Sequence, residues 1–139
     1  MGSYGVFAKC DIKSGALIFA ERPLVVAPLA ITVSPDYGTH QKNQAVLLEY
    51  ERVLKEAVSR LPPEAQANFR ALHNSFTGDG SGPLLGITKT NNYGIMGLYD
   101  GSDMNGQYIG VYKIASRINH RSLTLLTLYQ TLLIIISAA

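Results

Sequence analysis

Residues 4–24 decide the expected fold and read Tyr-Gly-Val-Phe-Ala-Lys-Cys-Asp-Ile-Lys-Ser-Gly-Ala-Leu-Ile-Phe-Ala-Glu-Arg-Pro-Leu. Two β-prone runs, at residues 4–8 and 16–20, flank a stretch at 11–15 whose aspartate, serine and glycine favour a turn. The stretch therefore predicts a β-hairpin. A further apolar run follows at residues 24–26. Pro23 confines that run to an edge or a bulge of a sheet, because proline has no N–H to donate to a neighbouring strand.

Residues 41–61 have the periodicity of an amphipathic helix. Apolar side chains recur at spacings of three, four and one, and form one stripe: Val46, Tyr50, Val53, Leu54, Ala57, Val58 and Leu61. The charged residues between 49 and 60 lie off this stripe, so we expect a solvated face. That face carries two favourable pairs spaced four residues apart: Glu51 with Lys55, and Glu56 with Arg60.

The two prolines at 62 and 63 end this helix. Pro63 can occupy the first turn of a second helix, where its missing N–H has no intrahelical partner to lose. A short apolar stripe then follows: Ala65, Phe69, Leu72 and Phe76. Residues 41–76 therefore predict an α-hairpin. The Gly-rich residues 77–83 predict a loop, and residues 84–121 predict short strands or turns because glycine and asparagine interrupt every apolar run.

The composition is that of a single globular domain. The 139 residues are 47% hydrophobic and 16% charged, so a core can form. The net charge is only +2 and the basic residues are scattered, which argues against direct binding of nucleic acid. One cysteine, Cys10, and three histidines far apart in sequence leave no spacing for a metal centre, so we assign no metal ligands.

Three stretches resemble SET-domain proteins. Residues 4–24 resemble the first SET hairpin, in which Gly-Val-Phe-Ala, a basic residue, Asp-Ile, a glycine turn, an apolar strand and Glu-x-Pro follow one another. Residues 116–120, Ser-Arg-Ile-Asn-His, resemble the segment that precedes Ser-Cys-x-Pro-Asn in SMYD-like SET proteins, and residues 90–95 resemble the asparagine–aromatic strand of that branch. Over residues 3–120 the chain is thus similar to SMYD-like, MYND-less SET proteins of the fungal type.

The resemblance implies an α+β fold and a methyltransferase family. Residues 1–121 would form an incomplete, β-rich SET domain of short strands and hairpins, with the α-hairpin at about 41–76 as an insert. The implied cofactor is S-adenosylmethionine, and the implied substrate is a protein lysine, as in histone lysine methylation. The residues that would contact the cofactor are Ser3, Tyr4, Gly5, Asn91, Asn119 and His120. Among these, Gly5 would allow close backbone approach, and Asn91 would reach the cofactor with its side-chain amide.

The chain also departs from the family pattern. Ser3 stands where the family usually has glycine, and Arg121 and Ser122 stand where Ser-Cys would follow His120. The catalytic tyrosine, the acidic strand, the aromatic lining of the lysine channel and the zinc-binding cysteines have no counterpart in residues 121–139. We therefore expect a truncated, catalytically impaired SET protein and assign no catalytic residue.

Two further interpretations stay open. In the first, the chain is a non-catalytic interaction module whose α-hairpin binds a partner protein. In the second, it is a small tail-anchored membrane protein, because residues 122–139 contain no charge and would span about 27 Å as a helix. Threonine, serine and glutamine interrupt that tail. Charged residues near the amino terminus lead us to expect no signal peptide and an intracellular location, in the nucleus or cytoplasm. The pattern leaves the oligomeric state open.

Overall fold

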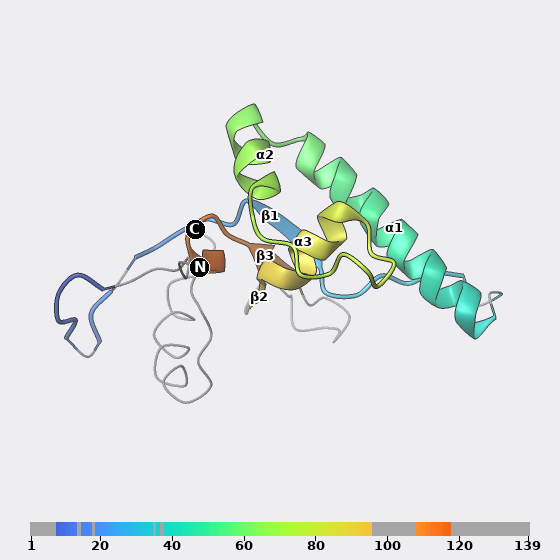
Figure 1. The fold of residues 1–139 in the computed structure, drawn as a ribbon, viewed down its shortest axis with the longest axis horizontal. Helices are drawn as coiled ribbons and strands as arrows, with labels where there is room; N and C mark the ends of the chain where they lie inside the picture. Colours follow the sequence, from blue (N-terminus) through green and yellow to red (C-terminus); the bar gives the residue numbers. More distant parts are fainter. Residues whose placement is uncertain are drawn as a thin grey trace, which may run out of the picture.

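The fold combines a small antiparallel sheet with helices, as the expected α+β class requires (Figure 1). The structure is a computed structural model that describes residues 8–13, 15–17, 19–34, 36, 38–95 and 108–117. Its elements, in chain order, are β1 (Val25–Pro28), α1 (Thr39–Ser59), α2 (Pro63–Arg70), α3 (Pro83–Asn91), β2 (Asn92–Ile95), β3 (Tyr108–Val111) and the 3-10 turn η1 (Ala115–Arg117).

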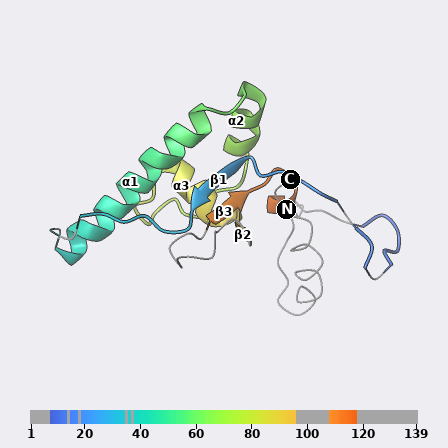
Figure 2. The ribbon, with the colours of Figure 1, turned by 180° about the vertical axis from the view of Figure 1, so that it is seen from behind.

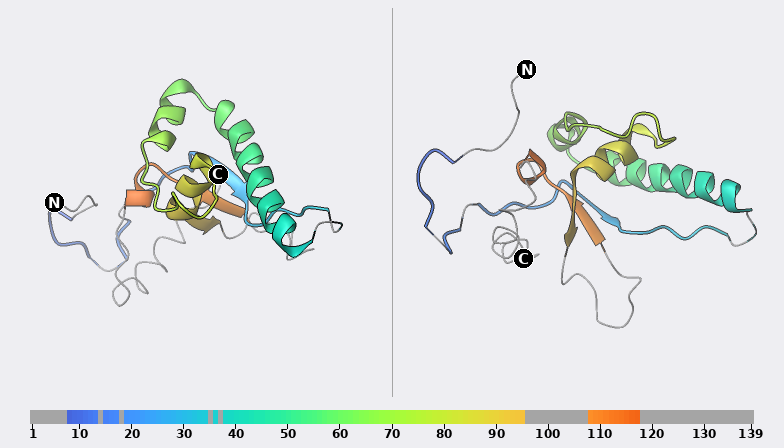
Figure 3. Two further views of the ribbon diagram at one scale, coloured as in Figure 1. Left: turned by 45° about the vertical axis from the view of Figure 1, so that its right-hand side comes forward. Right: turned by 60° about the horizontal axis from the view of Figure 1, so that its bottom comes forward.

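The described strands form one antiparallel sheet in the order β1-β3-β2. Val111 of β3 pairs with Val25 on one side and with Asn92 on the other, so β3 is the central strand. Strand β1 lies at an edge, which confirms the restriction expected from Pro23. The helices lie on one face of this sheet, as the right-hand view of Figure 3 shows.

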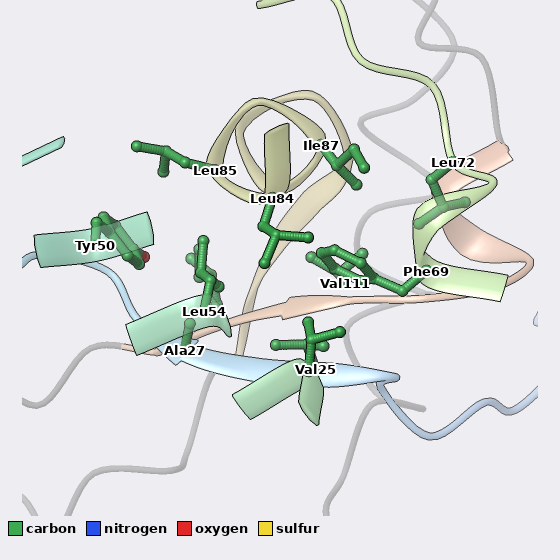
Figure 4. Packing of buried hydrophobic residues seen from close by; sticks show 12 residues of the cluster. Val25, Ala27, Tyr50, Leu54, Phe69, Leu72, Leu84, Leu85, Ile87 and Val111 are labelled. Atoms are coloured by element: carbon green, nitrogen blue, oxygen red, sulfur yellow. The ribbon is translucent and has the colours of Figure 1, made fainter. Parts of the chain in front are cut away.

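The core lies between the sheet and the helices (Figure 4). Leu54 and Val58 of α1 are 0% exposed, as is Phe69 of α2. The other buried members of the cluster come from every layer: Val25, Ala27, Tyr50, Leu72, Leu84, Leu85, Ile87, Ile109 and Val111. Each fully buried aliphatic or aromatic side chain contributes about 1.5–3 kcal/mol relative to an exposed one. The predicted apolar stripe of α1 is therefore confirmed at Tyr50, Leu54 and Val58, whereas Val46 and Val53 are only half-buried and lie outside the cluster.

The two predicted helices are present, but they do not form a hairpin. Helix α1 packs on β1 and α3, whereas α2 turns away after residues 60–62 and packs on α3 (Figure 2). Pro63 is the first residue of α2, as predicted. The pairing was wrong because the main packing partner of α2 is α3 rather than α1, and Phe69 of α2 joins the common core.

Residues 83–91 form a helix where short strands or turns were predicted. Glycine in a helix interior is unfavourable, and Gly86 was read as a breaker. In the fold this position needs glycine, because a Cβ there would collide with the side chain of Asn74. The start of α3 is stabilised from outside the segment: the Glu51 carboxylate accepts hydrogen bonds from the N–H groups of Leu84 (3.1 Å) and Leu85 (2.7 Å). Glu51, predicted to lie on a solvated face, is thus a helix cap.

Only part of the predicted first hairpin lies within the described residues. The turn is confirmed, since the N–H of Ala16 donates to Lys13 O (3.0 Å) and Gly15 has a φ of +79°. The second arm is not a strand at residues 16, 17, 19 and 20, and the residues 4–7 of the first arm lie outside the described residues. The first regular strand is instead β1, the run expected after Pro23.

The predicted tail, residues 122–139, lies outside the described residues. Within the described part of the chain, no helix has the length and apolar character needed to cross a membrane.

Candidate functional site

Asn91 is the one expected cofactor-contacting residue that the structure describes. It is the last residue of α3 and is 5% exposed. Ser3, Tyr4, Gly5, Asn119 and His120 lie outside the described residues, so their roles stay predictions. The candidate site is therefore built outward from Asn91.

Both amide hydrogens of Asn91 are used inside the protein. Nδ2 donates to the backbone oxygens of Ile87 and His73, each at 2.7 Å. The first bond folds the side chain back one turn along α3, and the second ties the segment after α2 to α3. If Asn91 contacts a cofactor, the side-chain oxygen Oδ1 would therefore make that contact.

Ser116 places the start of the Ser-Arg-Ile-Asn-His segment against Asn91. Its hydroxyl donates to the backbone oxygen of Asn91 (2.8 Å) and accepts from the N–H of Tyr112 (3.1 Å). Asn91 of the 90–95 stretch and Ser116, the first residue of the 116–120 stretch, thus come together near the ends of α3 and β3.

Glu21, near the end of the first family-like stretch, binds the residues that directly precede Ser116. Its two carboxylate oxygens accept four hydrogen bonds of 2.9–3.0 Å from the successive N–H groups of Lys113, Ile114 and Ala115. Successive N–H groups at the start of a helical turn form a concave site for an anion, and here the protein fills it with its own carboxylate. We name this contact the Glu21 clamp.

Two tyrosines pack together beside the clamp. Tyr93 pairs with Gly110 across the sheet, and Tyr112 follows Val111, so the alternation of strand side chains puts both rings on the face opposite the helices. The rings meet edge to face, with centroids 6.1 Å apart. Gly110 leaves the space for Tyr112, because a Cβ there would lie 2.8 Å from the Tyr112 hydroxyl.

The hydroxyl groups of this pair differ in their partners. Tyr93 Oη donates to the backbone oxygen of Ala115 (2.9 Å), whereas Tyr112 is 0% exposed and its Oη has no hydrogen-bond partner among the described residues. Burial, with a smaller contribution from the Glu21 charge, raises the pKa of Tyr112 from 10.0 to about 12. Tyr112 is therefore a neutral phenol at pH 7, able to donate a hydrogen bond but unsuited to accept a proton as a base.

The described residues of the site hold segments of the chain in position and are not arranged for acid–base catalysis. Its one carboxylate, Glu21, is engaged with backbone N–H groups, and no cluster of three histidine, cysteine, aspartate or glutamate residues suitable for a metal occurs among the described residues. The sequence did not single out Glu21 or Ser116 individually. The one sequence feature that could have indicated them is their position in the motifs Glu-x-Pro and Ser-Arg-Ile-Asn-His.

No protein-family model, no curated protein and no solved structure matches this chain. The resemblance to SET proteins therefore depends on the quoted residues and on their arrangement.

Proposed function

We propose that this chain is a SET-type protein related to the S-adenosylmethionine-dependent protein-lysine methyltransferases, and that its own methyl transfer is impaired. One observation carries the proposal: the three family-like stretches meet at the end of β3. Ser116, which begins the third stretch, bonds to Asn91 of the second, and Glu21 of the first stretch bonds to residues 113–115, which directly precede Ser116.

Methyl transfer needs a site in which residues from distant parts of the chain are held close together. S-adenosylmethionine supplies a methyl group on a sulfonium, and the protein must align that group with a neutral lysine amine and exclude water. Such alignment is built from backbone groups and a few polar side chains. By the resemblance, Gly5 would admit the cofactor to the backbone, Asn91 would offer Oδ1, and Asn119 with His120 would line the same pocket.

The impairment follows from the residues after His120. Arg121 and Ser122 replace the start of Ser-Cys-x-Pro-Asn, and no tyrosine with the family's surrounding pattern follows. Residues 121–139 therefore do not supply the residues expected to bind the lysine, whereas most of the residues expected to bind the cofactor are present at positions 3–120. A protein lysine, such as one of a histone, is the substrate class that the family implies.

An NMR titration of the ¹⁵N-labelled chain with S-adenosylhomocysteine tests the proposal, because it detects binding even at millimolar affinity. We expect saturable shifts at Gly5, Asn91, Asn119 and His120, and none in the middle of α1. The absence of saturable shifts, or shifts confined to α1 and α2, would refute the proposed family.

A second measurement tests the impairment separately. Incubation with labelled S-adenosylmethionine and histone peptides is expected to transfer no methyl group to lysine. Formation of methyllysine would contradict the impairment and leave the family assignment intact.

The interaction-module alternative stays a prediction. Tyr50 of the α1 stripe is 9% exposed, and its hydroxyl donates to the backbone oxygen of Pro28 in β1. The chain's own sheet thus covers Tyr50, whereas Val46 and Val53 of the same stripe are half-buried. The tail-anchor alternative concerns residues 122–139, outside the described residues, and stays a prediction.

A further inference from the structure

We infer that residues 122–139 dock on the outer face of the sheet, which is the face opposite the helices. The docking surface is an apolar patch that the described chain leaves exposed on β1 and β3. This inference goes beyond the proposed function and does not depend on it.

Both faces of the sheet are apolar. Val25, Ala27, Ile109 and Val111 belong to the core that the helices cover. Side chains alternate along a strand and paired residues share a face, so the next residues along β1 and β3, with their partners in β2, point away from the helices. None of these outer-face residues is charged: Val26, Pro28, Tyr93, Ile95, Tyr108 and Gly110. An antiparallel sheet with one face in water normally carries polar side chains there, so this pattern is typical of a sheet covered on both faces.

The described residues cover the outer face near the end of β3. Tyr93, Tyr112 and Ala115 form a buried cluster there, and Phe19 packs against it. Each of the three residues of the cluster is at most 9% exposed.

The outer face is open towards β1. Val26 of β1 is 41% exposed and Tyr108 of β3 is 38% exposed. Pro28, the partner of Tyr108 across the strands, is half-buried on the same face. We name Val26, Pro28 and Tyr108 the outer patch. Neighbouring apolar side chains that stay exposed together indicate a surface made for a further contact.

Residues 122–139 have the composition and the position in the chain to cover the outer patch. They contain no charge, and 12 of the 18 are apolar, so their exposure to water is unfavourable. Ala115 lies on the outer face, because Tyr93 Oη donates to its backbone oxygen (2.9 Å). From Arg117, the last described residue, the chain to Ser122 can span about 17 Å, whereas β1 and β2 lie about 10 Å apart. Residues 122–139 therefore begin within reach of all three strands.

The length and charge of the segment also fit the outer face. Even as a helix, 18 residues extend over about 27 Å, about twice the length of a four-residue strand. Neither the segment nor the outer patch carries a charge, so their contact removes no ion from water.

Covalent attachment favours this segment over a second copy of the chain as the occupant. A segment held by a short linker has an effective concentration on the order of millimolar at a site within its reach. Separate chains at micromolar concentration compete poorly with it. The outer patch is therefore filled within one molecule.

Paramagnetic broadening by a nitroxide tests the contact in the full chain. Serine replaces Cys10, the one cysteine, and Gln130→Cys carries the nitroxide at a polar position near the middle of the segment. We expect the ¹⁵N–H signals of Val26 and Tyr108 to lose at least half of their intensity. The signal of Leu48, an exposed apolar residue of α1 on the helical side, should be broadened at least threefold less.

Two lysine variants provide a matched comparison in the nitroxide-labelled chain. Val26→Lys places a charge in the outer patch, whereas Leu48→Lys places one at an exposed apolar position outside it. Val26→Lys should reduce the broadening at Tyr108 at least threefold, and Leu48→Lys should leave it unchanged. Equal effects of the two variants overturn the inference. If Val26→Lys does not fold, the comparison of Val26 and Tyr108 with Leu48 in the unsubstituted patch decides alone.

A mixed sample identifies the other possible occupants. It contains ¹⁵N-labelled chain without nitroxide and nitroxide-labelled chain without ¹⁵N. Broadening of Val26 and Tyr108 in this mixture, as strong as in the doubly labelled chain, assigns the patch to a second copy and overturns the inference. Absence of broadening at both residues in either sample overturns it as well. Partition of the nitroxide into phosphatidylcholine vesicles with both signals unbroadened assigns the segment to a membrane, with the same consequence.

Discussion

Replacing Tyr112 with phenylalanine is expected to stabilise the chain, whereas the same change at Tyr93 is expected to destabilise it. The two rings touch edge to face on the same side of the sheet, so they share most of their surroundings. Their hydroxyl groups differ: Tyr93 Oη donates to Ala115 O at 2.9 Å, whereas Tyr112 Oη has no partner in the part of the chain that the structure describes.

The magnitude at neutral pH follows from that difference. A buried hydroxyl without a hydrogen bond costs about 1–3 kcal/mol, and removing it forfeits only the dispersion contacts of one oxygen atom. We expect Tyr112→Phe to raise the free energy of unfolding by about 1 kcal/mol. Tyr93→Phe removes a made bond and leaves the Ala115 oxygen without that donor, so it should lower the free energy of unfolding by about 1–2 kcal/mol.

The pH dependence gives an independent test of the same hydroxyl. The pKa of Tyr112 is raised from 10.0 to about 12, so the folded state holds the phenolic proton more tightly than the unfolded chain. The resulting stabilisation is fully present below pH 10 and is lost as the pH rises through 12. With one pKa unit worth about 1.4 kcal/mol, the loss amounts to about 3 kcal/mol. Tyr112→Phe has no phenolic proton to lose at this position. The difference in free energy of unfolding between this variant and the wild type should therefore grow by the same amount as the pH rises.

Urea unfolding followed by far-ultraviolet circular dichroism measures these differences, since the chain contains no tryptophan. The series comprises the wild type and the two phenylalanine variants, at pH 7 and across the alkaline range. Destabilisation by Tyr112→Phe of more than about 1 kcal/mol at pH 7 would mean that the hydroxyl has a partner, and would refute the reasoning. An advantage that stays constant above pH 10 would refute the raised pKa.

Two further predictions concern the core and the loop before α3. Leu54→Ala is expected to lower the free energy of unfolding by about 2–5 kcal/mol because Leu54 is 0% exposed, whereas Leu48→Ala, at a position 68% exposed on the same helix, should change it by less than about 0.5 kcal/mol. Equal effects in urea unfolding would contradict the orientation of α1. A hydrogen bond from Lys89 lowers the pKa of Asp79 from 3.8 to about 2, so its stabilising contribution is present above pH 3.8 and lost as the pH falls through 2. An NMR titration of the Asp79 carboxyl should show its pKa rising towards 3.8 in Lys89→Met, and an unchanged pKa would exclude the ion pair.

Elements set by a local pattern could be predicted from the sequence. The stripe of α1 repeats along the helix from Val46 onward, and Tyr50, Leu54 and Val58 are buried where it placed them. Pro63 began α2 for a local reason, its missing N–H, and Pro23 marked the edge strand for the same reason. In each case the physical cause lies within a few residues of the effect.

Helix α3 could not be predicted in this way, because its causes lie elsewhere in the chain. Its N-terminal position, Gly82, makes no side-chain cap, and the capping carboxylate comes from Glu51, 33 positions before Leu84. Gly86 reads as a breaker until the side chain of Asn74 is seen to occupy the space of a Cβ. Propensity weighs a residue against the average environment, and tertiary contacts overrode it here.

The candidate site was likewise predictable only where its features are local in the sequence. Its motifs were visible in the sequence, and Asn91 was named for a role that stays a prediction. The clamp was not visible, because Glu21 stands in a Glu-Arg-Pro break where a charged residue is ordinarily solvated. Nothing local marks its carboxylate as the acceptor for three N–H groups more than 90 positions away. The tyrosine pair was missed because Tyr93 and Tyr112 meet only once β2 and β3 are paired.

Glu51 and Glu21 together show how the fold and the proposed site depend on each other. Each carboxylate lies at the start of a distant helical segment. Glu51 reaches α3 only when α1 packs on it, and Glu21 reaches residues 113–115 only when the chain before β1 lies beside the end of β3. The N–H groups of Leu84 and Lys113 would otherwise bond to water, so these helical starts gain stability only on tertiary folding. It follows that α3 and the 113–117 turn, which together hold Asn91 and Ser116, should form cooperatively with the core rather than before it. A site assembled in this manner has no preformed local fragment, and a peptide spanning residues 83–117 should be unable to reproduce the contact between Ser116 and Asn91.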